Sequence, residues 1–328
     1  MKYTSTLAVV TLLVLSACDS IGVTRTSAQL PPASNERSLP DELLYVDGSE
    51  GSTQHPYIEV FNAKDVSNQN PIYTIPPRKG GQWVLFAVDA QNDLYAVNYF
   101  RNAAEVDVFA SGATKPKFSC VLNALPSDSY IAGNTLYLAT STDTIDEYTL
   151  PLTRNGSDCA APALVLTDRY ARLRGIEMIS VAVDAHGNIF DSWIAGYSKY
   201  KVHIDEFPAG SKEARSYASA GSLNGGFMAF DSKGDIVTSV SHDGKGDNIA
   251  VFQAGKRHAA FYDGIPEGVY FAPAFGSHDS VLFMSADYPN PEIRVYAYNP
   301  AAGRPGKSLG AFSNIWYGAS SIAVYAKL

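Results

Sequence analysis

A short apolar pattern recurs six times along residues 42–328, and this recurrence constrains the fold more than any other feature of the sequence. Each copy holds a Leu-Tyr-like pair, and successive pairs lie 42 to 53 residues apart. Self-similarity at such a period is typical of solenoids and propellers. The six pairs are Leu44-Tyr45, Leu94-Tyr95, Leu136-Tyr137, Ile189-Phe190, Ile236-Val237 and Leu282-Phe283.

A second motif follows each pair and has the alternation of a strand with one buried face. In every copy an apolar residue stands three positions before an aromatic one. Further short strands are predicted before each pair and after each second motif, so a repeat of about 48 residues holds four strands. The six second motifs begin at Ile58, Val106, Ile145, Ile204, Ile249 and Ile293.

The strand order at the two ends of the repeated region indicates a closed ring. The first repeat lacks a strand before Leu44, whereas segment 321–326 supplies an extra copy after the sixth repeat. A strand that completes the first sheet closes the ring and leaves only short sheet edges. We therefore predict an all-β protein, a six-bladed β-propeller of four-stranded blades over residues 42–328. A β-sandwich and an open solenoid are the alternatives, but a solenoid requires terminal caps, which the sequence does not show.

The predicted turns between first and second strands begin with Asp and place Gly or Asn where a positive φ is needed. Segments 86–95 and 181–190 both carry such a turn between two apolar strands. They resemble repeats of NHL-type and SMP-30/gluconolactonase-like propellers. The resemblance implies a ligand site at one mouth of the central channel, built by loops between second and third strands and between blades. It specifies the fold much better than the activity.

The N-terminus has the pattern of an export signal. Lys2 precedes an apolar run from Leu7 to Ala17, which is too short to span a bilayer as a helix. Small residues before Cys18 resemble the bacterial lipobox, which implies cleavage after residue 17 and acylation of the Cys18 thiol. Residues 18–41 then form the acylated cysteine and a flexible tether. We expect a lipid-anchored, extracytoplasmic protein of the bacterial cell envelope; a plain secretory signal is the alternative.

Two further cysteines, Cys120 and Cys159, can oxidise in an exported protein. Equivalent points on neighbouring repeats lie too far apart for a disulfide, although irregular loops can bring two such residues together. The sequence leaves this pairing open.

The charge balance of 25 Lys and Arg against 33 Asp and Glu, a net −8, argues against nucleic-acid binding. We expect a monomeric domain whose partners are the membrane, through Cys18, and a small anionic ligand or an envelope protein. The predicted mouth loops hold nine of the 25 basic residues together with aromatic residues. Guanidinium groups bind carboxylate or phosphate, but ordinary polar loops also explain the pattern. The candidate ligand-binding residues are Arg78, Arg101, Arg172, Trp193, Tyr197 and Tyr288.

The SMP-30-like resemblance also implies a divalent cation, Ca or Zn, at the channel mouth. Among the corresponding strand ends, Asp47 and Asn98 carry suitable oxygens, but the predicted first strands carry no Glu. The alternative is a protein without a cofactor. His242, beside Asp243, is a candidate base by resemblance to virginiamycin B lyase, or else a solvated loop histidine.

These features predict a membrane-tethered, extracytoplasmic propeller that acts as a ligand-binding or protein-interaction module rather than as an enzyme. The alternative is a metal-dependent, lactonase- or lyase-like enzyme with its site at the channel mouth.

Overall fold

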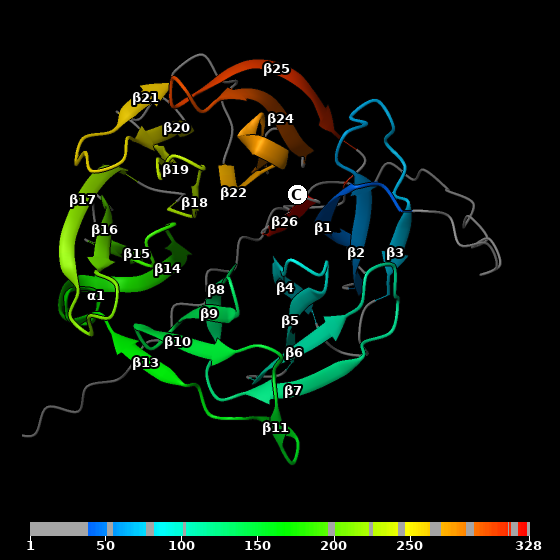
Figure 1. Cartoon of the computed structure of the whole chain (residues 1–328), viewed down its shortest axis with the longest axis horizontal. Helices are drawn as coiled ribbons and strands as arrows, with labels where there is room; N and C mark the ends of the chain where they lie inside the picture. The colour runs from blue at the N-terminus through cyan, green and yellow to red at the C-terminus, as the bar shows by residue number, and fades with distance from the viewer. Residues whose placement is uncertain are drawn as a thin grey trace, which may run out of the picture. The chain divides into compact units, whose positions relative to one another are not determined.

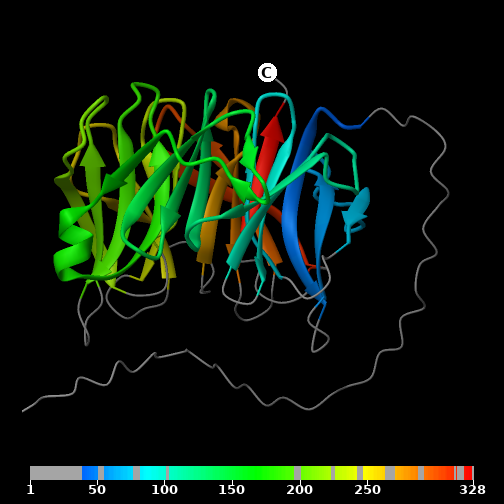
Figure 2. The same ribbon diagram turned by 90° about the horizontal axis from the view of Figure 1, so that it is seen from below.

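Six antiparallel sheets, one for each sequence repeat, form the blades of a β-propeller in the computed structural model (Figure 1). The strands run along the axis of the ring, as the side view shows (Figure 2). Each innermost strand contacts the innermost strand of the next blade. The structure describes residues 39–50, 55–76, 82–100, 103–195, 201–222, 226–241, 247–262, 270–286, 292–313, 315 and 321–326. The blades belong to one unit, Leu39–Leu328, whereas the unit Met1–Ser38 lies outside the described residues.

The strands of each blade follow one another from the axis outward. Blade 1 is β26 (Ile322–Ala326), β1 (Glu42–Glu50), β2 (His55–Asn62) and β3 (Tyr73–Ile75). Blade 2 is β4 (Gln82–Val88), β5 (Leu94–Phe100), β6 (Ala103–Phe109) and β7 (Phe118–Leu122). Blade 3 is β8 (Pro126–Ala132), β9 (Thr135–Thr140), β10 (Thr144–Thr149) and β13 (Leu164–Thr167). Blade 4 is β14 (Gly175–Val183), β15 (Ile189–Ala195), β16 (Lys201–Phe207) and β17 (Arg215–Ser222).

The remaining blades have the same order. Blade 5 is β18 (Met228–Phe230), β19 (Ile236–Ser241), β20 (Asp247–Phe252) and β21 (Ala260–Tyr262). Blade 6 is β22 (Tyr270–Phe275), β23 (Val281–Ala286), β24 (Glu292–Asn299) and β25 (Arg304–Phe312). Helix α1 (Arg169–Arg174) and the 3-10 helix η2 (Ser277–Asp279) are short. Within the described residues, no helix is long and apolar enough to cross a membrane.

The C-terminal strand closes the ring, as the sequence predicts. Strand β26 pairs antiparallel with β1, and this pairing sets Ile322 opposite Val46 and Val324 opposite Leu44. The first blade therefore contains strands from both ends of the repeated region. Because β1 would otherwise present an unpaired edge, this closure protects the innermost part of blade 1.

The hydrophobic core lies between neighbouring blades. In the interface between blades 1 and 2, Trp83 is 1% exposed and its ring lies 5.8 Å from that of Phe109. Tyr45 packs in the same cluster, and its hydroxyl donates to Asn92 Oδ1 at 2.8 Å. Burial of one such large side chain stabilises the fold by about 2–3 kcal/mol.

Repeated aspartate turns connect first and second strands on one end of the ring, which we call the turn face. In blades 2, 4 and 5 the first carboxylate oxygen accepts the N–H of the residue four positions later, at 2.8–2.9 Å. Asn92, Gly187 and Gly234 in these turns have φ of 61°, 80° and 81°. The predicted turn chemistry is confirmed. The three aspartates are Asp89, Asp184 and Asp231.

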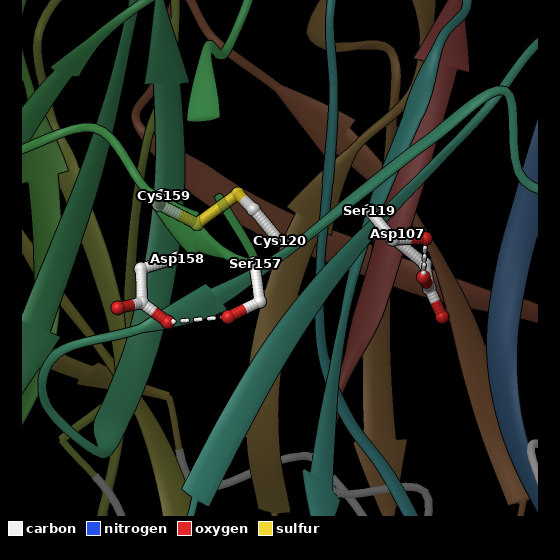
Figure 3. Close-up of a disulfide and its surroundings, with 6 residues drawn as sticks. All are labelled: Asp107, Ser119, Cys120, Ser157, Asp158 and Cys159. Atoms are coloured by element: carbon white, nitrogen blue, oxygen red, sulfur yellow. Dashed lines mark hydrogen bonds between the residues drawn. A yellow bond between two sulfur atoms is a disulfide. The ribbon is translucent and has the colours of Figure 1, made fainter. Parts of the chain in front are cut away.

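A hairpin of blade 3 reaches back to blade 2 and explains the disulfide that the sequence left open. Strands β11 (Arg154–Asn155) and β12 (Asp158–Cys159) form the hairpin, and β12 pairs parallel with β7. Cys120 and Cys159 are joined there, with their Cα atoms 4.8 Å apart (Figure 3). The disulfide thus links the outer edge of one blade to the next.

Candidate ligand site in the central channel

The innermost strands of all six blades surround a cavity of about 270 Å³ on the axis of the ring. Most of the residues that line it have apolar side chains, and backbone groups and a few polar side chains complete the wall. Such a cavity with a few convergent polar groups is the default location for a small-molecule site. Its lining includes Phe86, Val88, Asp128, Ser129, Tyr130, Ile131, Val181, Met228, Phe230, Pro273, Phe275, Ser321, Ile322 and Val324.

Asp128 is the charged side chain of this lining within the described residues. Its Oδ1 accepts the N–H of Ser129 at 2.8 Å, and its Oδ2 accepts the Ser180 hydroxyl at 2.5 Å and the Val181 N–H at 3.1 Å. Burial raises the pKa of Asp128 to about 7, although these three hydrogen bonds oppose the shift. The cavity therefore holds a carboxyl group that exchanges its proton near neutral pH, which is a feature of functional sites.

The position that Asp128 holds in the innermost strand of blade 3 also carries a side-chain hydrogen-bond acceptor in blades 4 and 1. The Ser180 hydroxyl accepts the Met228 N–H of blade 5, and the Ser321 hydroxyl accepts the Phe86 N–H of blade 2, both at 3.1 Å. In blade 5 the position equivalent to Asp128 holds Phe227, which has no side-chain acceptor. The residue of blade 6 that would donate to such an acceptor is Pro273, and proline has no N–H. Side-chain acceptors thus join the inner strands of successive blades and fix the cavity wall.

The cavity continues into a wider mouth on the turn face, because Tyr130, Ile131 and Phe230 line both spaces. Three carboxylates line this mouth of about 590 Å³, and its described lining contains no basic residue. Burial, and then the charges of Asp184 and Asp279, raise the pKa of the Tyr130 hydroxyl to about 12. The mouth is therefore electronegative. The carboxylates are Asp184, Asp231 and Asp279.

Two of the mouth carboxylates accept hydrogen bonds from a neighbouring blade. Asp231 Oδ2 accepts the Tyr298 hydroxyl at 3.0 Å, and Asp279 accepts the Ser232 N–H. These partners hold the negative groups in place around the entrance. Together with Asp128 below, they form a channel that favours a positively charged group and apolar contacts behind it.

Asp47 and Asn98, the predicted metal ligands, lie in the interface between blades 1 and 2. Asp47 stands opposite Ile58, the first residue of the second motif in its repeat. In the next repeat the matching residue is Val106, but Asn98 stands opposite Glu105, so Asn98 lies one position further along its strand than Asp47 does. The two strand ends are therefore not equivalent, because a step of one residue reverses the face of a strand. The offset directs both side chains into the same interface, where each is 2% exposed. Within the described residues, no three His, Cys, Asp or Glu side chains converge to hold a metal ion.

Trp193 lies on β15 and not in a loop, because this strand extends to Ala195. The side chain is 3% exposed, its ring stacks on His203 at 4.3 Å, and its Nε1 donates to Asp205 Oδ2 at 2.8 Å. The indole is thus part of the core between blades 3 and 4, outside the channel site.

Three buried carboxyl groups lie beside this tryptophan. Asp191 stands directly opposite Asp205 on the neighbouring strand, and Asp168 comes from the segment before α1. All are at most 1% exposed. Burial, followed by the negative charge of Asp168, raises the pKa of Asp191 well above its ordinary value. Burial also raises the pKa of Asp205 to about 6. Asp191 therefore retains its proton at neutral pH.

Arg172, a predicted ligand contact, is exposed on α1 at the outer rim of the ring (Figure 1). The helix replaces a predicted loop because Asp168 Oδ1 accepts the N–H groups of Tyr170 and Ala171 at 2.6 and 3.3 Å and caps it. The positive charge of Arg172 opposes the raised pKa of Asp143 nearby. The other predicted site residues lie outside the described residues: Arg78, Arg101, Tyr197, Tyr288, His242 and Cys18.

Sequence reasoning missed Asp128 because the apolar strand pattern of this repeat begins only at Tyr130, after the polar residues 127–129. The structure starts β8 at Pro126, with an irregular register between Pro126 and Asp128. A signal was present in the repeat. Ser180 and Ser321 both precede the same apolar pattern, Val-Ala-Val or Ile-Ala-Val, and Asp128 stands at the equivalent position.

Comparison with known proteins supports the fold. Neither a protein-family model nor a curated protein matches the sequence. A chain of a nidogen/laminin complex is 12% identical with a TM-score of 0.59, and the match covers 87% of this chain and 98% of that chain. A proposed 6-phosphogluconolactonase from Bacteroides uniformis is 11% identical with a TM-score of 0.56, covering 86% and 98%. TolB from Acinetobacter baumannii is 12% identical with a TM-score of 0.56, covering 87% and 66%.

These similarities define the class of protein. The chain is a six-bladed β-propeller, as the NHL and SMP-30-like resemblance implied. At such low identity the likeness concerns the fold alone, so membership of either family stays a prediction.

Proposed function

We propose that this protein is a membrane-tethered, extracytoplasmic propeller lipoprotein that binds a small ligand in its central channel. The observation that carries the proposal is the cavity of about 270 Å³ that all six innermost strands enclose around Asp128. The cavity is lined mostly by residues with apolar side chains, it has an open mouth, and it holds one titrating carboxyl group. This combination is typical of a binding site for small molecules.

The cysteine chemistry supports the location. Disulfides persist in oxidising compartments outside the cytoplasm, and Cys120 and Cys159 are paired. The chain has 3 cysteines, so this pairing leaves Cys18 as the thiol available for acylation. Labelling of cells with radioactive palmitate tests the tether. We expect label in the full chain and none in Cys18→Ser; equal labelling of both chains would disprove the tether.

The ligand class follows from charge. The anionic ligand predicted from the sequence concerns the loops between second and third strands, most of whose candidate residues lie outside the described residues. The described lining of the channel and of its mouth on the turn face is acidic and favours a cation there. A monovalent organic cation with an apolar body pairs with Asp128 and buries its body against Phe86, Phe230 and Phe275. Hydrogen bonds to a charged partner contribute about 1.5–3 kcal/mol, which is a factor of about 10 to 100 in affinity.

Calorimetry with benzylammonium tests this ligand class on the full chain in a non-ionic detergent. We expect benzylammonium to bind at least about tenfold more tightly than neutral benzyl alcohol. Because Asp128 must be ionised to pair, the affinity for benzylammonium should fall by about 10- to 100-fold from pH 8 to pH 5. Asp128→Asn abolishes this preference and its pH dependence.

Ser321→Ala is the matched control, because Ser321 lines the same cavity without a charge. It should leave the preference for the cation intact. Equal binding of the cation and the alcohol, or an Asp128→Asn variant that binds the cation as the natural chain does, would refute the cationic ligand. The metal-dependent enzyme stays a prediction, since its support is the fold-level likeness to a proposed lactonase.

A further inference from the structure

A second hollow, which we call the 4–5 groove, runs outward between blades 4 and 5. It has a volume of about 540 Å³ and begins at the channel mouth, where Asp184 and Phe230 line both spaces. From there it passes Phe190 and Glu206 and reaches Arg215 and Tyr217 on the outermost strand of blade 4. The channel site uses none of these outer residues.

Aromatic rings form the floor of the 4–5 groove. Phe190 is 4% exposed, and its ring lies 5.2 Å from Tyr217 and 5.0 Å from Phe230, edge-on to each. The buried Phe190 thus holds two partly exposed rings, one from each blade, in fixed positions. Fixed aromatic rings provide contact area for a planar ligand at little entropic cost.

The rim of the groove carries positive charge in an acidic protein. Lys233 and Arg257 are exposed there, and neither has a carboxylate partner among the described residues. The acidic groups of the groove are already engaged. Glu206 accepts two hydrogen bonds from Arg215, at 3.0 and 2.9 Å, and Asp184 accepts three from its own turn.

Arg257 lines the groove together with Tyr217, and its positive charge opposes the raised pKa of the Tyr217 hydroxyl. A cation beside a ring suits a ligand in which an anionic group is attached to a planar ring. Free guanidinium and ammonium groups bind carboxylate and phosphate oxygens through charge-assisted hydrogen bonds.

We propose that the 4–5 groove is a second binding site, for a small aromatic anion that is a carboxylate or a phosphate ester. Its ring lies on Tyr217 and Phe230, and its anionic group contacts Arg257 and Lys233. This site shares Phe230 with the channel site but differs from it in its charged contacts and in the charge of its ligand. Asp128→Asn and Arg257→Gln test the two sites separately, so either proposal can fail without the other.

Titration of the full chain in a non-ionic detergent with phenyl phosphate tests the proposal. Inorganic phosphate isolates the anionic contact, and benzyl alcohol isolates the ring contact. Phenyl phosphate should bind at least about tenfold more tightly than either fragment. A Kd above about 10 mM for phenyl phosphate, or equal binding of phenyl phosphate and inorganic phosphate, would overturn the proposal.

Variants then locate the site. Arg257→Gln should weaken phenyl phosphate binding at least about tenfold. Lys256→Gln is the matched control, because Lys256 is the exposed neighbour of Arg257 in the chain and does not line the groove. Tyr217→Leu should weaken phenyl phosphate more than inorganic phosphate, and Asp128→Asn should change neither. Equal losses in Arg257→Gln and Lys256→Gln would show diffuse charge attraction and refute the site.

Discussion

Asp128 in blade 3 accepts the backbone N–H of Val181 in blade 4 at 3.1 Å, so a side chain joins two inner strands that share no sheet ladder. Ser180 and Ser321 make the same type of contact to Met228 and Phe86. The inner wall of the channel is therefore held by hydrogen bonds between blades as well as by apolar packing. In blade 3 the bridging group is a carboxyl, and it makes this part of the wall sensitive to pH.

Asp128→Asn should change how stability depends on pH. The folded pKa is about 7 and the ordinary value is 3.8, so the folded chain keeps a proton that the unfolded chain releases. This retained proton adds to the free energy of unfolding below pH 4. The contribution, on the order of 2 to 4 kcal/mol, is lost as the pH rises to 7. Asparagine does not titrate, so we expect the variant to be more stable than the natural chain at pH 8.

At pH 4 the order should reverse. The asparagine amide group cannot accept the Ser129 N–H while its oxygen serves Ser180 and Val181, which costs about 1 kcal/mol. Urea denaturation between pH 4 and pH 8 measures both effects. If the free energy of unfolding depends on pH in the same way for both chains, the raised pKa of Asp128 is contradicted.

The ring could be predicted from the sequence because its signals are local and repeated. Alternation within strands, aspartate turns and the extra C-terminal strand all indicate the same closed array, and the pairing of β26 with β1 confirms it. The channel site was harder to predict. Which residues face the axis depends on register, and register is set by cross-strand pairing, as the offset of Asn98 from Asp47 shows.

Trp193 shows a second limit of sequence reasoning. An aromatic residue near a strand end is compatible with a binding loop and with a buried interface. The fold decides between them, because Asp205 and His203 on the next strand provide a hydrogen bond and a stacking partner. Sequence spacing alone does not reveal that such partners will converge.

Asp191→Asn should stabilise the protein at alkaline pH. Asp191 is fully buried opposite Asp205 and near Asp168, so ionisation places like charges together in the core. The folded chain must keep a proton on this group, and that requirement lowers stability as the pH rises. We expect the melting temperature at pH 8 to rise by about 5 °C, and the difference to vanish at pH 4. A lower melting temperature at pH 8 would show that the Asp191 charge is needed.

Replacement of both bridged cysteines by serine should lower the free energy of unfolding by about 2–4 kcal/mol, because the unfolded chain regains the freedom of the closed loop. Cys120 and Cys159 are 39 positions apart and join blade 2 to the hairpin of blade 3. Denaturation with and without reductant gives an internal control. Reductant should lower the stability of the natural chain to that of the double variant and leave the double variant unchanged.

Deletion of residues 321–328 should open the ring. The truncated chain loses the β26 ladder with β1, the Ser321 contact to Phe86 and one of the six walls of the channel. An unpaired β1 edge favours association with other chains, so we expect loss of cooperative unfolding and larger species in size-exclusion chromatography. Deletion of Lys327 and Leu328 alone spares the strand and is the matched control. A synthetic peptide with the sequence of residues 321–326 should restore cooperative unfolding, because it can fill the vacant position beside β1. If the truncated chain unfolds at the natural midpoint without the peptide, strand closure contributes little to stability.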